Sequence, residues 1–141
     1  MKILVINGPN LNLLGTREPD IYGAESLAEI QAYTQNCLGD KAQLEWWQSN
    51  SESEIIDKVQ SVITSDFDAL IINPAAYSHT SIAILDALKN LKIPIVEVHL
   101  SNIYNRESFR HSLLTAQASS IIMSGLGKDS YYYAALALLR K

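Results

Sequence analysis

The chain has 141 residues, of which 48% are hydrophobic and 18% charged, and its formal net charge is −4. This length suits one domain with its own hydrophobic core, so residues 1–141 are interpreted as a single domain. The composition excludes a disordered chain, and no apolar run approaches the roughly 20 residues that span a bilayer, so no membrane contact is expected. Because Lys and Arg form no cluster that could neutralise phosphates, no nucleic-acid partner is expected.

Cysteine and histidine are too few and too scattered for a structural zinc site. The chain holds one cysteine, Cys37, which cannot form an internal disulfide, and three histidines. Residues 1–6 form a strand-like run without the layout of a signal peptide. We therefore expect a cytoplasmic protein that needs no metal, with Cys37 in the core of a helix.

Strand-like runs and helix-like segments alternate along the chain. The first strand is predicted at 2–6 and is followed by a long loop to residue 23. Ser26 and Glu29 have the spacing of a capping box, which predicts the start of a helix before a strand at 43–47, and the next helix begins behind Ser51 or Ser53. The remaining predicted elements, in chain order, are a strand at 69–73, a helix at 81–91, a strand at 95–98, a short helical turn at 107–113, a strand at 120–124 and a helix at 130–139.

This alternation predicts an α/β fold. Three of the strands are nearly continuous apolar runs, which is typical of strands buried on both faces of a parallel sheet. Strands and helices in strict alternation predict an open sandwich with helices on both faces of the sheet. Five strands fit the flavodoxin-like order 2-1-3-4-5, whose crevice lies at the carboxyl ends of strands 1 and 3. We therefore expect the functional residues in the loops after strands 1, 3 and 4.

Those three loops carry most of the arginines and histidines of the chain. The first loop, 7–23, has seventeen residues, whereas connections from strand to helix usually have about 2–6. The second loop is 73–81 and the third is 97–110. Three of the four arginines and all three histidines lie in or beside these loops, and none of the loops has the glycine pattern that binds phosphates. The loops therefore favour a small hydroxylated acid over a nucleotide.

Each of these polar residues also has a purely structural interpretation. His79 precedes a helix and could cap it. Glu97 and His99 face the same way at a strand end and could form a buried structural pair. The other five residues can be interpreted as ordinary turn or loop residues without a chemical role: Asn10, Arg17, Tyr22, Asn73 and His111.

Five segments of the chain closely resemble the type II 3-dehydroquinate dehydratases. They are Asn-Gly-Pro-Asn-Leu-Asn-Leu-Leu-Gly at 7–15, Arg-Glu-Pro-x-x-Tyr-Gly at 17–23, Asn-Pro-x-Ala-Tyr-x-His-Thr-Ser at 73–81, Glu-Val-His-x-Ser-Asn at 97–102 and Arg-Glu-x-Phe-Arg at 106–110. The resemblance covers essentially the whole chain. It implies conversion of 3-dehydroquinate to 3-dehydroshikimate and water without a cofactor, in a homododecamer of four trimers. Two departures are Ala75, where many members have Gly, and the stretch after Arg110, which lacks the His-His-Ser often found there.

The resemblance also implies catalytic roles for individual residues. Tyr22 would be the base that takes a proton from C2 of the substrate, and Arg17 would favour its phenolate. Asn10 would hold a water on the enolate oxygen. His99 would protonate the departing C1 hydroxyl, with Glu97 as its orienting partner.

The remaining implied roles concern substrate binding. Ring hydroxyls and the substrate carboxylate would be bound by Asn73, His79, Arg110 and the backbone N–H groups of Leu100 and Ser101. Asp86 would reach the site of a neighbouring subunit, and Arg106 is interpreted as a residue of the loop or rim.

The chemistry of an elimination β to a ketone fits these residue types. It needs a base, stabilisation of an enolate and an acid for the leaving hydroxyl. A covalent imine route would need a lysine, but the three loops contain none, and the nearest by topology, Lys128, has no evident activating neighbour. The alternative to an enzyme is a non-catalytic flavodoxin-like binding module. A receiver domain is disfavoured because Asn7 and Asn73 stand where it needs acidic residues.

Overall fold

Five parallel strands form the centre of the molecule in a computed structural model that describes residues 1–140. The strands are β1 (Lys2–Asn7), β2 (Gln43–Gln48), β3 (Ala69–Asn73), β4 (Ile95–His99) and β5 (Ile121–Ser124), in the order β2-β1-β3-β4-β5. All four pairings are parallel. The predicted sheet order is therefore confirmed.

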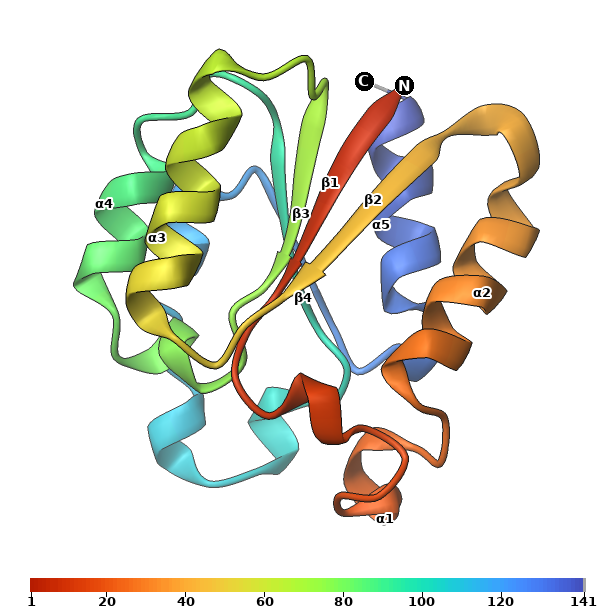
Figure 1. Ribbon diagram of the computed structural model, residues 1–141. Coiled ribbons are helices and arrows are strands. Elements are labelled where there is room, and N and C mark those ends of the chain that lie inside the picture. The colour runs from red at the N-terminus through yellow and green to blue at the C-terminus, as the bar shows by residue number, and fades with distance from the viewer. Residues whose placement is uncertain (141) are drawn as a thin grey trace.

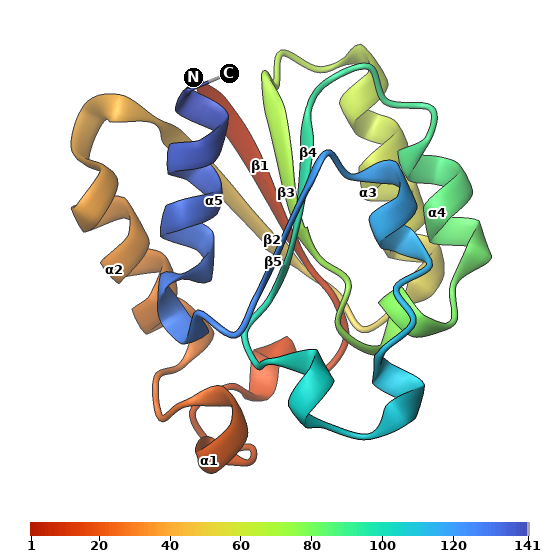
Figure 2. The same cartoon turned by 180° about the vertical axis from the view of Figure 1, so that it is seen from behind.

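Two helices cover each face of this sheet, as Figures 1 and 2 show. The helices α2 (Leu27–Leu38) and α5 (Ser130–Leu139) pack on one face, and α3 (Glu52–Ser61) and α4 (Ile82–Leu88) pack on the other. Because side chains alternate along a strand, β1 contributes Ile3 and Val5 to one core and Leu4 and Ile6 to the other. The apolar runs recognised in the sequence are thus buried on both sides.

Serine side chains cap the helices α2, α3 and α4. Ser26 accepts a hydrogen bond from the backbone N–H of Glu29, whose carboxylate accepts one from the N–H of Ser26, so the predicted capping box is present. Ser51 caps α3, which decides between the two predicted serines, and Ser81 caps α4. The helix predicted at 81–91 ends at Leu88, because the N–H groups of Asn90 and Leu91 bond carbonyls only three residues back.

The expectation that Cys37 lies in a helix core is wrong. The inward stripe of α2 consists of Ile30, Thr34 and Leu38, which recur every four residues, and Cys37 lies off this stripe and is exposed. The Thr34 hydroxyl is buried and donates to the carbonyl of Ile30.

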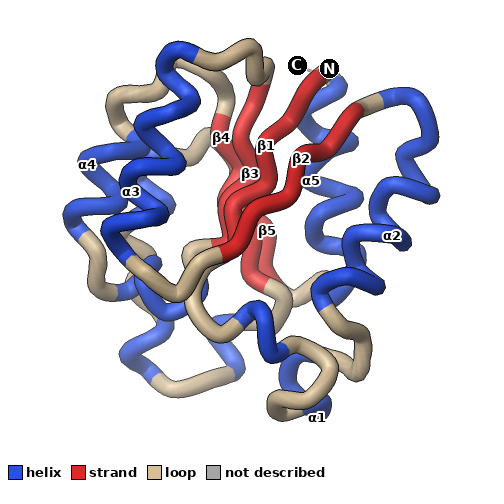
Figure 3. The backbone as a smooth tube through the Cα atoms, in the orientation of Figure 1, coloured by secondary structure: helices blue, strands red, loops and turns tan. Residues whose placement is uncertain are grey.

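The carboxyl ends of the strands all lie at one edge of the sheet. Figure 3 shows the loops and short helical turns gathered there, opposite the end where the two termini lie. They include the short helix α1 (Pro19–Tyr22), a 3-10 turn at Ala75–His79 and two more at Ile103–Asn105 and Ser108–Arg110. This loop layer positions the site described next.

Candidate active site

One cavity at this edge collects almost all of the residues that the sequence singled out. The loops after β1, β3 and β4 line it with Pro9, Asn10, Leu11, Arg17, Tyr22, Asn73, Ala75, Ala76, His79, His99, Leu100, Ser101, Ile103, Arg106 and Arg110. The topology explains the gathering, since β1, β3 and β4 are adjacent in the sheet and end at the same edge.

The loops after β1 and β3 are in direct contact beneath the cavity. The N–H of Gly8 donates to the carbonyl of Asn73 at 2.8 Å, and a Cβ at position 8 would lie 2.5 Å from the carbonyl oxygen of Pro74. Only glycine fits this approach. Two residues later Asn10 has a left-handed backbone with φ of 68°, and its N–H donates to the side-chain oxygen of Asn50 at 3.0 Å.

The segment from Gly15 to Gly23 covers the cavity and is called the lid. Both glycines have positive φ, 91° and 89°, so the lid is bounded by turns that suit glycine. Before it, Leu11 and Leu14 are buried in the core, whereas Leu13 is exposed. The lid brings Arg17 over the ring of Tyr22, with 5.0 Å between the guanidinium carbon and the ring centroid.

A second guanidinium lies against Tyr22, that of Arg106, which is in the loop after β4 as expected but lines the cavity with its side chain. The guanidinium carbon of Arg106 is 5.1 Å from the ring centroid, and its side chain is only 12% exposed. The Arg106 side chain also donates to the hydroxyl of Ser101 at 3.3 Å. The 3-10 turns between β4 and β5 fold the loop back over the site, which spacing along the sequence did not reveal.

Glu97 and His99 form a buried pair at the end of β4. The Nε2 atom of His99 lies 2.8 Å from one carboxylate oxygen of Glu97, and the hydroxyl of Thr115 donates to the other at 2.7 Å. Glu97 and Thr115 are fully buried and His99 is 6% exposed. With Nε2 occupied by Glu97, the Nδ1 atom is the ring nitrogen of His99 left for a ligand.

His79 faces His99 from the loop after β3. Their rings are stacked with centroids 6.2 Å apart, and the Nδ1 atom of His79 lies 2.9 Å from the carbonyl oxygen of Ser112. Burial lowers the pKa of His79 from its ordinary value, and the nearby His99 and Arg110 act in the same direction, while the Ser112 carbonyl opposes them. His79 is therefore biased towards the neutral ring.

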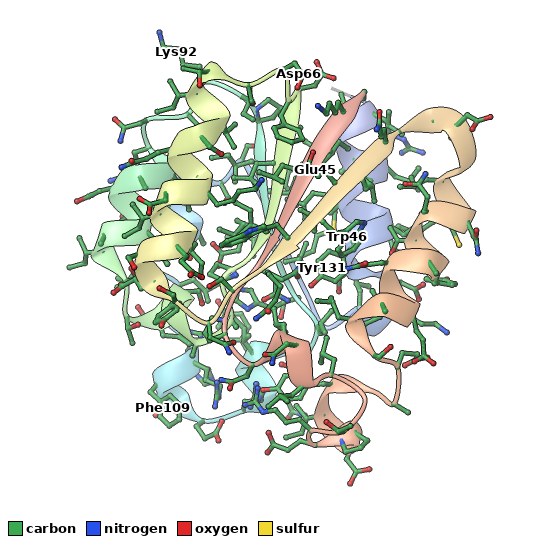
Figure 4. All side chains as sticks on the ribbon, viewed as in Figure 1. Glu45, Trp46, Asp66, Lys92, Phe109 and Tyr131 are labelled. Carbon is green, nitrogen blue, oxygen red and sulfur yellow. The ribbon has the colours of Figure 1, made fainter. Side chains whose placement is uncertain are left out.

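Asn73 is held in place by a buried network that reaches α5. Its amide donates to the hydroxyl of Tyr131 at 3.1 Å, its oxygen accepts from the N–H of Ala75, and the Tyr131 hydroxyl donates to Asn7 at 2.5 Å. Figure 4 shows Tyr131 pointing from α5 towards the sheet, where its ring lies 4.9 Å from that of Trp46. Burial raises the pKa of the Tyr131 hydroxyl, so this group remains a neutral donor.

Ala75 occupies a backbone conformation that favours glycine. Its φ is 53°, which explains in physical terms why glycine suits this position. The departure noted in the sequence therefore falls on the wall of the cavity. The second departure leaves His111 exposed, with Nε2 3.2 Å from the carbonyl oxygen of Arg106, in line with its structural interpretation.

The other sequence candidates lie at different distances from the cavity. Leu100 and Ser101 line it directly after β4, and Arg110 does so while bonding Glu107 at 2.8 Å. Asp86 lies on the exposed side of α4, outside the cavity of its own chain. Lys128 is 3.3 Å from the carboxylate of Glu25 and lines a neighbouring cavity instead.

Two features are absent from residues 1–140, a group of metal ligands and a membrane-spanning helix. In that range no three His, Cys, Asp or Glu side chains are grouped as metal ligands. No helix within the same range has the length and apolar character to cross a membrane.

Comparisons with known proteins point to one family. The family model described as dehydroquinase class II matches residues 1–139. The 3-dehydroquinate dehydratase of Aliarcobacter butzleri is 51% identical over 141 residues, covering 99% of this chain and 85% of the relative, and that of Clostridium botulinum (strain Hall) is 53% identical over 135 residues, covering 94% and 90%. The crystal structure of type II dehydroquinase from Propionibacterium acnes superposes with a TM-score of 0.94 at 38% identity and covers 99% of this chain and 97% of that one.

Proposed function

The chain belongs to the class II dehydroquinase family, and from this premise we propose a role for each side chain of the cavity. The protein is a lyase that dehydrates 3-dehydroquinate to 3-dehydroshikimate in the shikimate pathway of aromatic amino-acid biosynthesis. Membership of this family favours an enzyme over the alternative, a non-catalytic flavodoxin-like binding module. The observation that supports the proposed roles is that a tyrosine whose ring contacts two arginines lines the same cavity as a histidine paired with a buried carboxylate.

Tyr22 acts as the base. Its phenolate oxygen takes the proton from C2, next to the ketone, and the electron pair of the broken C–H bond forms an enolate. An unperturbed tyrosine is ionised in only about one molecule in a thousand at pH 7. The guanidinium groups of Arg17 and Arg106, on the ring at 5.0 and 5.1 Å, favour the phenolate by Coulomb attraction.

Asn10 and His99 complete the elimination. Asn10 holds a water that donates a hydrogen bond to the enolate oxygen. The enolate then returns its electron pair to form the C1–C2 double bond, the bond from C1 to its hydroxyl breaks, and Nδ1 of protonated His99 supplies the proton that makes water the leaving group. Glu97 stabilises the charged imidazolium from its other side.

The rest of the cavity binds the substrate. Asn73, His79 and Arg110 bind ring hydroxyls, and the backbone N–H groups of Leu100 and Ser101 bind the carboxylate. His79 fits this role because its neutral ring has one nitrogen bonded to Ser112 and the other available to a hydroxyl. No metal or organic cofactor takes part in the proposed route.

Asp86 acts in a neighbouring subunit, in a homododecamer of four trimers. It lies one turn after Ile82 on α4, and Ile82 is 63% exposed, so the outward face of this helix combines a carboxylate with an unusually exposed apolar side chain. A second subunit covers this face and receives Asp86 near its own cavity. We place the assembled enzyme in the cytoplasm.

Adding 3-dehydroquinate to the purified protein tests the reaction directly. The conjugated enone of the product absorbs in the ultraviolet, so the absorbance should rise with time. His99→Ala should lower kcat by roughly 10²- to 10⁴-fold, which is typical of a positioned acid or base, while substrate still binds. A protein that binds 3-dehydroquinate without producing the absorbance band would contradict the reaction, and a normal kcat for His99→Ala would contradict only the role of His99.

A further inference from the structure

A buried carboxylate with few partners lies behind His99. Both oxygens of Glu97 are used, one by His99 at 2.8 Å and the other by the Thr115 hydroxyl at 2.7 Å. Among residues 1–140, His99 is the only basic side chain within ion-pair distance of Glu97, which is completely buried. Since a buried carboxylate without donors is strongly destabilised, the hydroxyl of Thr115 supplies a needed hydrogen bond.

Thr115 is itself held firmly in the loop between β4 and β5. It is completely buried at the start of a 3-10 turn, and its neighbour Leu114 donates its N–H to the carbonyl of Ser78 at 2.7 Å. Three residues earlier, the Ser112 carbonyl is bonded to His79. The segment 112–115 therefore contacts one histidine of the stacked pair directly and the other through Glu97.

We infer that Thr115 is a positioning residue for the acid step. Its hydroxyl fixes the Glu97 carboxylate so that the opposite oxygen keeps the Nε2 atom of His99 and directs Nδ1 into the cavity. Without this donor the carboxylate could turn away from His99, and the orientation of the imidazole would no longer be fixed. This inference rests on the proposed role of His99.

Several charged or titratable groups besides Glu97 line the cavity together with His99. From the lid and the loops after β3 and β4 they are Arg17, Tyr22, His79, Arg106 and Arg110. Within residues 1–140 the Thr115 hydroxyl is hydrogen-bonded to Glu97 and to none of these five side chains, so a substitution at Thr115 reaches His99 through Glu97.

Thr115→Val tests the inference because valine keeps the shape and removes the hydroxyl. We expect kcat to fall by about 10- to 100-fold with KM changed by less than about threefold, as for loss of a hydrogen bond to a charged group. Thr115→Ser, which restores the hydroxyl, should return kcat to near the wild-type value. Thr34→Val is the matched control, because Thr34 is equally buried and its hydroxyl bonds a helix carbonyl far from the cavity.

A double-substitution cycle separates positioning from general damage. In a Glu97→Gln background, Thr115→Val should lower kcat by no more than about twofold, since the pathway through the carboxylate is already lost. Full additivity of the two losses, or a normal kcat for Thr115→Val, would overturn the inference. If Thr115→Val does not fold, Thr115→Cys takes its place in every measurement, because a thiol of similar size is a weak donor. A His99→Ala enzyme with normal kcat would instead remove the acid role of His99 itself.

Discussion

At the scale of single residues, the ionisation of Tyr22 is the most demanding requirement of the site. Tyr22→Phe removes only the phenolic oxygen, so turnover should be almost abolished while ligand binding is retained. Arg17→Ala and Arg106→Ala should each lower kcat by about tenfold or more, because each removes one cation beside the ring of the proposed base. Arg140→Ala, at an exposed position outside the cavity, is the control. A normal kcat in both variants would show that the two arginines do not assist Tyr22.

His79 links the site to the acid stability of the protein. Because burial lowers its pKa, the unfolded chain takes up a proton at this residue more readily than the folded chain does. The free energy of unfolding should therefore fall as the pH drops below about 6.5, the ordinary pKa of histidine. Above that pH the contribution of His79 to stability should be fully present. Denaturant midpoints between pH 7.5 and 5 should fall less in His79→Asn than in the wild type or in the exposed-site control His111→Asn. An equal fall in all three proteins would contradict this account.

At the scale of elements, the contact between the loops after β1 and β3 determines the spacing of the site. Gly8→Ala would place a Cβ 2.5 Å from the Pro74 oxygen, so the two loops must separate. We expect a loss of stability of about 2–3 kcal/mol and a reduced kcat, since Asn10 and Asn73 move apart. Gly39→Ala meets no atom within 4 Å, but its φ of 57° and ψ of −135° are essentially confined to glycine, so it should cost about 1–3 kcal/mol and leave kcat unchanged. Equal effects of the two variants on kcat would contradict the argument.

The lid should move as a unit between its two glycines. Its residues are mostly exposed, whereas Leu11 and Leu14 anchor the chain before it. Trypsin should cut after Arg17 in the free enzyme, and an equilibrated mixture of substrate and product at saturating concentration should slow this cut by closing the lid. The bond after exposed Lys41, remote from the cavity, reports the general protease rate. Equal slowing at both bonds, or none, would argue against closure.

At the scale of the whole molecule, assembly and catalysis should depend on the same helix face. Sedimentation should show a large closed oligomer, and Ile82→Glu should dissociate it because the side chain becomes charged in an interface. Asp86→Ala should raise KM even in particles that sediment like the wild type. Lys89→Ala, at an exposed position directly after the same helix, is the control for loss of a surface charge. A fully active monomer would refute the role of the neighbouring subunit.

The sequence predicted the sheet order and the three loops because both follow from local patterns. Apolar runs and capping serines are short-range signals, and the topology that follows from them places the loop residues at one edge. Contacts between distant segments were not predictable in this way. Arg106 reaches Tyr22 only because the loop after β4 folds back, and Thr115 reaches Glu97 from a turn with no recognisable motif. The four-residue spacing of Ile30, Thr34 and Leu38 is visible in the sequence, and Cys37, which lies off this stripe, was the one residue of the helix wrongly expected in the core.

The hydrogen bond between Asn7 and Tyr131 also bears on how the protein folds. It joins residues 124 positions apart, the first at the end of β1 and the second in α5, which follows all five strands along the chain. Until α5 docks, the face of β1 that α5 shares with α2 is only partly covered, and the Asn7 side chain lacks this hydrogen bond. Docking of α5 therefore completes both this half of the core and the support of Asn73 at the cavity, which makes it a late step of folding.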